Sequence, residues 1–180
     1  MTLIEKAMRL ALAAHAGQVR KNDSSPYIVH PVMVSMLLQA EGFPEEVVAA
    51  ALTHDVLEDT TVPPEELRQT IGDEAFSYVV AVSEDQSLLW EERKEQYVKT
   101  VVAGPHGAKA VSIADKIHNA QSILKDYEEK GSAVWQVFHR GKDKKMWFEE
   151  MLYSEVSAVW EHPLLDQYRV VLDQLHQIEA

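Results

Sequence analysis

Apolar residues recur at helical spacing along almost the whole chain. From Leu3 to Ala14 the apolar positions follow a period of about 3.6 residues, and Thr2 to Glu5 has the pattern of a capping box. Gly17 ends this first predicted helix. The same spacing predicts further helices from Pro31 to a stop at Gly42, over 44–59, from Pro63-Pro64 to Gly72, and over 73–82, 90–103, 108–130, 133–138, 143–160 and 163–178.

The alternation that is typical of strands is almost absent. Tyr27-Ile28-Val29 is too short to build a sheet, and residues 18–29 and 83–89 have the composition of surface loops. The chain contains no internal repeat, no low-complexity tract and no long linker. The pattern therefore predicts an all-α fold, with residues 1–180 forming a single domain.

Composition excludes several classes of function. The chain has no cysteine, which rules out disulfides, iron–sulfur clusters, cysteine zinc sites and a thiol nucleophile. Its net charge of −12 argues against a nucleic-acid partner, because affinity for a phosphate backbone depends on clustered Lys and Arg. No apolar run approaches the roughly 18 residues that span a bilayer, and the N-terminus lacks the features of a signal peptide. We therefore expect a cytoplasmic protein without a membrane partner; the oligomeric state stays open.

One predicted helix carries polar residues at positions that its apolar pattern predicts to be buried in the core. The segment 49–59 begins as an apolar run and then carries His54 and Asp55 side by side, followed one turn later by Glu58 and Asp59. A buried carboxylate without a partner is expensive, so it normally pairs or binds a metal. The alternative is a core His–Asp hydrogen bond with the other two acids in solvent. Acids at a helix C-terminus oppose the helix dipole, which favours a functional role.

Two further segments carry polar groups in an apolar setting. In the segment 110–119, Asp115 and Asn119 lie on one helix face with His118 offset from them. In the segment 26–31, His30 lies between Pro26 and Pro31 at a loop-to-helix junction. Taken alone, each of these is typical of a cap or of a hydrogen-bonded core residue.

Together the segments resemble a known family. The stretches PYIVHP, ALTHDVLEDT and ADKIHN, in this order, resemble the HD metal-dependent phosphohydrolase superfamily, and within it the hydrolase domain of Rel/Spo-type alarmone enzymes and the small alarmone hydrolases. AAHAGQVRK, before them, extends the likeness. It is strongest over 3–124, and 125–180 are expected to be C-terminal helices of the same domain. The resemblance implies a compact multi-helix HD-type domain.

The resemblance also implies roles for individual residues. Glu58 and Asp59 would be the catalytic acid–base and orienting pair. Apart from the resemblance, His118 is an alternative metal ligand because it lies three residues after Asp115 on the same predicted helix. One divalent ion is expected, generally manganese in this family, although the affinity order of divalent metals means that the ligands alone do not identify it. The metal ligands implied by the resemblance are His30, His54, Asp55 and Asp115.

Substrate contacts are implied for residues at both ends of the likeness. Arg20 and Lys21 match positions that face the nucleotide, Asn119 matches a position near the ribose or phosphates, and Ser122 lies one turn further on. The alternative for each is a side chain without a role in binding, either exposed to solvent or hydrogen-bonded within its own helix or loop. Lys142 belongs to the basic–aromatic segment 138–148, which either clamps a pyrophosphate or is a solvated helix start.

The implied activity is hydrolysis of the 3′-pyrophosphate of guanosine alarmones, (p)ppGpp, to GDP or GTP and pyrophosphate. Two alternatives stay open at this point. The first is an HD phosphohydrolase that acts on another nucleotide or on a phosphate monoester. The second is a non-catalytic nucleotide-binding module that has kept the metal site.

Overall fold

The helical pattern becomes an all-α fold in a computed structural model that describes residues 1–20 and 24–180. Within this part of the chain the only β-type pairing is an isolated bridge between Val19 and Pro26. The predicted fold class is therefore confirmed. The helices are α1 (Leu3–Ala14), α2 (Val29–Ala40), α3 (Glu45–Thr53), α4 (Val56–Asp59), α5 (Pro64–Val82), α6 (Trp90–Ala103), α7 (His106–Lys130), the 3-10 helix η1 (Gly131–Val137), α8 (Gly141–Ser157) and α9 (Pro163–Gln177).

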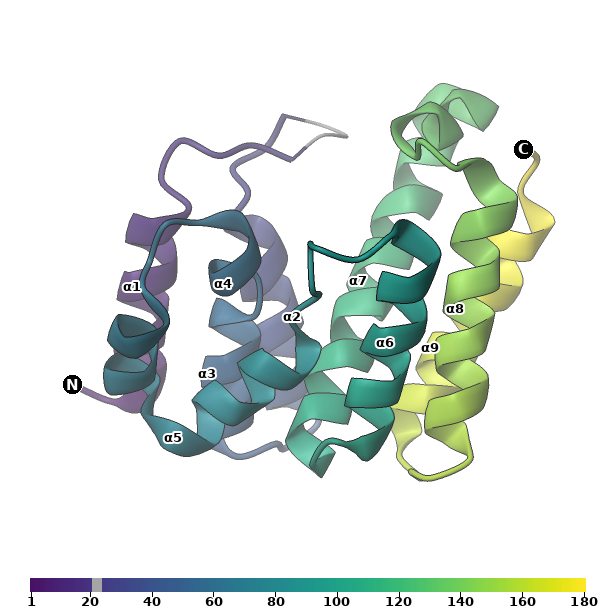
Figure 1. The fold of residues 1–180 in the computed structure, drawn as a ribbon. Coiled ribbons are helices and arrows are strands. Elements are labelled where there is room, and N and C mark those ends of the chain that lie inside the picture. Colours follow the sequence, from purple (N-terminus) through teal and green to yellow (C-terminus); the bar gives the residue numbers. More distant parts are fainter. Residues whose placement is uncertain (21–23) are drawn as a thin grey trace.

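Helix α7 lies between two groups of helices (Figure 1). On one side α3 packs against α1, α2 and α5, and on the other α8 packs against α6 and α9. α7 touches both groups, and its first half, from Gly107 to Asp115, is buried on every side. A helix that is apolar all round belongs in a core. Buried side chains from Ala7 to Leu175 form one hydrophobic cluster around it.

The predicted helix over 44–59 is wrong in one respect, because it is divided: α3 ends at Thr53 and α4 begins at Val56, with His54 and Asp55 in a turn between them. Two side chains at this point bond to carbonyl oxygens of the preceding turn: Thr53 Oγ1 donates to Ala49 O at 2.9 Å, and His54 Nδ1 lies 2.7 Å from Ala51 O. Such local bonds compete with continuation of the helix. The short helix α4 follows this break, and the amide of Asp59 bonds to Asp55 O at 2.9 Å.

Other boundaries agree with the sequence pattern to within a few residues. The predicted stop at Gly72 is a kink inside α5, where this glycine has φ 82°, a conformation that is strained for other residues. The loop over 83–89 separates α5 from α6 as predicted. None of the helices in the described ranges is long and apolar enough to cross a bilayer.

Candidate metal centre and catalytic cleft

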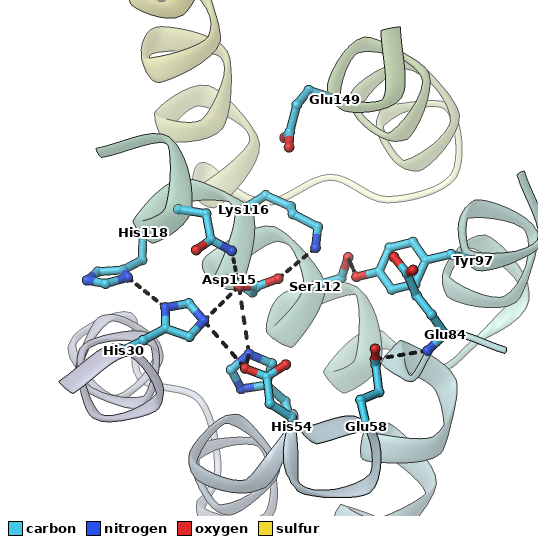
Figure 2. Close-up of polar contacts among 12 residues, drawn as sticks. His30, His54, Glu58, Glu84, Tyr97, Ser112, Asp115, Lys116, His118 and Glu149 are labelled. Carbon is cyan, nitrogen blue, oxygen red and sulfur yellow. Dashed lines mark hydrogen bonds and ion pairs between the residues drawn. The ribbon is translucent and has the colours of Figure 1, made fainter. Parts of the chain in front are cut away.

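Three buried side chains from three different helical segments converge on one point (Figure 2). His30 comes from the first turn of α2, His54 from the end of α3 and Asp115 from the middle of α7. One candidate ligand atom from each lies within 4.8 Å of the other two. Asp115 Oδ1 is 3.0 Å from His30 Nε2 and 3.7 Å from His54 Nε2. The chain thus brings together groups that are 85 and 61 residues apart in the sequence, since 115 − 30 = 85 and 115 − 54 = 61.

The orientation of the imidazoles fits a metal ion. His54 Nδ1 is placed to donate to Ala51 O, which leaves the lone pair of Nε2 facing the cluster, and this buried atom has no hydrogen-bond partner among the described residues. His30 is held in the same sense, because its Nδ1 lies 2.8 Å from Nδ1 of His118. The nitrogen lone pairs of the two imidazoles and the carboxylate oxygens that they face repel one another unless a cation lies between them.

Charge at the cluster favours a cation as well. Burial by itself disfavours a charged imidazole, yet the carboxylates of Asp55 and Asp115 outweigh it and raise the pKa of His54 well above its ordinary value. Burial likewise opposes ionisation of Asp115, but Lys116 and the two histidines hold its pKa well below the ordinary value. A divalent ion supplies the positive charge that this pocket favours.

Asp55, the fourth ligand expected from the sequence, also reaches the cluster. Its Oδ2 is 3.1 Å from His54 Nε2 and 3.8 Å from His30 Nε2. The same oxygen accepts a short hydrogen bond of 2.5 Å from the hydroxyl of Tyr27. Tyr27 fixes this carboxylate, a role that the sequence pattern did not reveal although the residue lies in the PYIVHP stretch.

His118 contacts a metal-ligand candidate and is not itself one of the converging groups. It touches the outer ring nitrogen of His30. Burial, together with the positive charge of Arg20, lowers the pKa of His118 to about 4, so its ring is neutral and can accept that bond. The structure therefore places His118 behind His30, where it orients that ring.

The cluster forms part of the wall of a cleft with a volume of about 640 Å³. Glu58 and Asp59 line this cleft beside the cluster. The loop over 83–89 holds Glu58 by two hydrogen bonds. Oε1 of Glu58 accepts from the amide of Glu84 at 2.9 Å, and its Oε2 accepts from Gln86 Nε2 at 3.0 Å. Burial raises the pKa of Glu58 to about 6. A carboxyl that titrates near neutral pH suits general acid–base work.

The residues expected to contact substrate divide into three groups. Arg20 Nη2 lies 3.4 Å from both Asn119 Oδ1 and Ser122 Oγ, and Asn119 Nδ2 donates to Asp115 Oδ1 at 2.6 Å. These three residues therefore meet beside the cluster. Lys21 lies outside the described residues. Lys142 is not in the cleft.

Lys142 instead bonds to the end of α9. Its ammonium group contacts the carbonyl of Ile178 and lies 3.3 Å from that of His176. Phe138 and Lys145, from the same basic–aromatic segment, line the cleft in its place. The sequence marked the segment but did not determine which of its cations faces inward, because that depends on how α8 is rotated against α6 and α9.

Comparison with known proteins agrees with this fold. Residues 7–142 match the family described as HD domain, which is well over half of the chain. The protein therefore belongs to the HD domain family, whose hydrolases bind a divalent metal, and His30, His54 and Asp115 form a site for one.

Several relatives are named as alarmone hydrolases. The guanosine-3′,5′-bis(diphosphate) 3′-pyrophosphohydrolase MESH1 of Danio rerio is 36% identical over 131 residues, which is 71% of this chain and 73% of that protein. An enzyme of Aquifex aeolicus named guanosine-3′,5′-bis(diphosphate) 3′-pyrophosphohydrolase is 31% identical over 73% of this chain but only 19% of its own length.

Solved structures share the fold. A metazoan relative of SpoT, described as hydrolysing ppGpp, has a TM-score of 0.80 with 24% identity, covering 97% of this chain and 96% of that one. A Listeria monocytogenes protein has a TM-score of 0.75 with 33% identity, covering 81% and 97% respectively. The first of these matches covers almost the whole chain, so it includes the C-terminal helices that lie beyond the sequence motifs of 3–124.

Proposed function

We propose that this protein is a metal-dependent phosphohydrolase that removes the 3′-pyrophosphate of guanosine alarmones, converting (p)ppGpp to GDP or GTP and pyrophosphate. The observation that carries the proposal is the buried cluster of His30, His54 and Asp115 with Glu58 and Asp59 beside it in one cleft. The names of the relatives give the substrate class.

The proposed cofactor is one divalent ion held by four side chains, and we propose Mn²⁺. Two imidazoles and two carboxylates are a mixed nitrogen and oxygen set, which suits a borderline-to-hard ion. The four side chains are His30, His54, Asp55 and Asp115. When bound, the metal would polarise a phosphoryl oxygen and lower the pKa of a water molecule, which would serve as the nucleophile.

We also propose a cytoplasmic location, with which the absence of cysteine is compatible.

The protein's own groups move the protons in the proposed reaction. Glu58 accepts the proton that the water loses as its oxygen bonds to the phosphorus attached to the 3′-oxygen. The bond from this phosphorus to the 3′-oxygen breaks, and the 3′-oxygen takes a proton from the carboxyl pair of Glu58 and Asp59. The water oxygen ends in pyrophosphate, so atoms balance and nothing is oxidised.

Substrate positioning is proposed for the Arg20 group. Arg20 crosses from the loop after α1 to α7, where Asn119 and Ser122 hold it. A guanidinium in this place can stack on a base or neutralise a phosphate. Lys21, its neighbour in sequence, is proposed for the same role from the family resemblance.

The test is release of pyrophosphate from ppGpp by purified protein. The protein is stripped with a chelator and reloaded separately with Mn²⁺, Mg²⁺ and Zn²⁺. A panel of other nucleotides and a phosphate monoester is assayed for phosphate and for pyrophosphate. We expect pyrophosphate from ppGpp, strongest with Mn²⁺, and release about 10² to 10⁴-fold slower from the Glu58→Gln variant that carries the same metal. The absence of pyrophosphate with every metal would refute the proposal.

A further inference from the structure

Two lysines line the cleft on a side for which no role has been given. Lys116 follows Asp115 on α7, and its Nζ lies 2.7 Å from Asp115 Oδ2. Lys145 comes from α8, and its ammonium group contacts the carboxylate of Glu149. Their side chains are 11% and 16% exposed, so only a small part of each faces the open cleft. Both lysines are thus partly buried cations on the cleft wall.

These lysines lie on the other side of Asp115 from the Arg20 group. Ser122, which holds Arg20, bonds to the carbonyl of His118 at 2.9 Å. Figure 2 shows His118 and Lys116 leaving α7 on opposite sides of Asp115, with Lys116 reaching towards Tyr97 and Glu149. The Nζ of Lys116 lies 5.0 Å from the centre of the Tyr97 ring. The metal cluster is therefore flanked by two separate cationic regions.

The balance of charge along the cleft makes these regions important for an anionic substrate. The cleft is lined by five carboxylates: Asp55, Glu58, Asp59, Glu84 and Asp115. Among the described residues that line it, the permanently charged cations are Arg20, Lys116 and Lys145. A pyrophosphoryl group carries several negative charges, and only part of that charge can lie against one metal ion. The remaining charge has to meet one of the two cationic regions.

Geometry assigns the two ends of the substrate differently. The Arg20 region offers a planar guanidinium and two hydrogen-bonding side chains, Asn119 and Ser122, which suit a nucleoside. The opposite region offers two ammonium groups, which bind phosphate as point charges. We propose that Lys116 and Lys145 form a subsite for the terminal phosphate of the 3′-pyrophosphoryl group, so that the substrate lies across the metal cluster. This inference rests on the proposed function for the identity of the substrate.

Calorimetry with inorganic pyrophosphate tests the subsite without relying on activity. The Mn²⁺-loaded protein is titrated at one fixed concentration of free Mn²⁺. We expect Lys145→Met to weaken pyrophosphate binding about tenfold or more, the effect of losing one charge-assisted contact. Glu149→Gln should tighten binding by about two- to fivefold, because Lys145 then lacks its counterion. Lys144→Met is the matched control, since Lys144 pairs with Glu91 and does not line the cleft.

The opposite signs separate a binding role from a structural one. If Lys145 and Glu149 only hold α8 together, both variants weaken pyrophosphate binding, and the proposal is wrong. It is also wrong if Lys144→Met has the same effect as Lys145→Met, or if the wild-type protein does not bind pyrophosphate. The double variant Lys145→Met/Glu149→Gln removes the whole pair and serves if the single lysine variant does not fold. It should bind pyrophosphate as weakly as Lys145→Met.

A second ligand shows which end of the cleft is affected. We expect Lys145→Met to change GDP binding by less than about twofold, whereas Arg20→Met weakens GDP much more than pyrophosphate. Equal losses for both ligands in both variants would overturn the assignment of ends. Hydrolysis of ppGpp is measured separately on the same samples. Lysine-dependent pyrophosphate binding without hydrolysis would refute the proposed function and leave the subsite intact.

Discussion

The two sides of the cleft are built in different ways. On the metal side, His30, His54 and Asp115 are almost fully buried, and the outer nitrogen of each imidazole is held by another group. On the side of α6 and α8, the charged groups are held in ion pairs: Lys145 pairs with Glu149, and Glu84 pairs with Arg93 and Lys94. The metal side presents hydrogen-bonded ligand atoms to one point and is preorganised, whereas the other side presents ion-paired cations that can face a charged ligand. The first arrangement suits an invariant chemical step and the second suits recognition of a charged substrate.

The largest effect is expected from the metal side. Asp115→Asn keeps the shape of the side chain but removes its charge, so the ligand set loses one anionic donor. Because the metal provides several kcal/mol of stabilisation, we expect ppGpp hydrolysis to fall about 10³-fold or more, together with the bound metal. Metal analysis after gel filtration and a pyrophosphate assay measure both. Full metal content with wild-type activity would show that Asp115 is not a ligand.

The next effect separates chemistry from metal binding. Glu58→Gln keeps the shape of the side chain and the oxygen that accepts from the amide of Glu84, but it loses the oxygen that accepts from Gln86 Nε2 and cannot accept a proton. We expect kcat to fall about 10² to 10⁴-fold while metal content stays at the wild-type level. Loss of metal along with activity would instead place Glu58 among the groups that hold the ion.

The dependence of kcat/KM on pH tests a residue that connects the two sides. Glu58 lies beside the metal cluster and is hydrogen-bonded by the loop over 83–89 that precedes α6. Burial raises the pKa of Glu58 to about 6, with Asp55 and Glu84 adding to the rise and Lys116 and the amide of Glu84 opposing it. As the pH falls through about 6, Glu58 becomes protonated and can no longer act as a base. We therefore expect kcat/KM to decline below about pH 6.

A variant of Gln86 sharpens this test. Gln86→Glu places a second carboxylate against Glu58, so the acid limb of the profile should move to higher pH. Gln69→Glu is the matched control: Gln69 also donates to a glutamate, Glu65, at 2.9 Å, but on an exposed face of α5. Equal profiles for both variants and the wild type would show that Gln86 does not contact the carboxylate of Glu58 in solution.

The smallest effect is expected at Lys142, which the sequence had placed in the substrate site. Its ammonium group bonds to the end of α9, so Lys142→Met should leave KM for ppGpp unchanged. Loss of these partly exposed contacts should lower the melting temperature by about 2–4 °C, which corresponds to about 1 kcal/mol in a chain of this size. A rise in KM would show that Lys142 belongs to the cleft after all.

Much of the metal side could be read from the sequence because its chemistry is local. His54, Asp55, Glu58 and Asp59 lie within a single short stretch, and helical spacing alone places them near one another. Periodicity also gave the helices, and glycine marked the stop after α2 at Gly42 and the kink inside α5 at Gly72. The break at His54 was missed because side-chain bonds to the previous turn override the helical pattern there.

Tertiary structure alone decided the opposite side. Glu84, Lys116 and Lys145 come from separate segments, and no spacing in the sequence relates them. Whether Lys142 or Lys145 faces the cleft depends on the rotation of α8 about its own axis, and a basic segment with cations at several phases does not fix that rotation. Periodicity specifies which residues of a helix share a face, but packing against other helices determines what that face meets. The sequence by itself thus determined the helices and, through its resemblance to a family, the candidate ligands of the metal site, and only the packing of α6, α7 and α8 decided what surrounds the substrate.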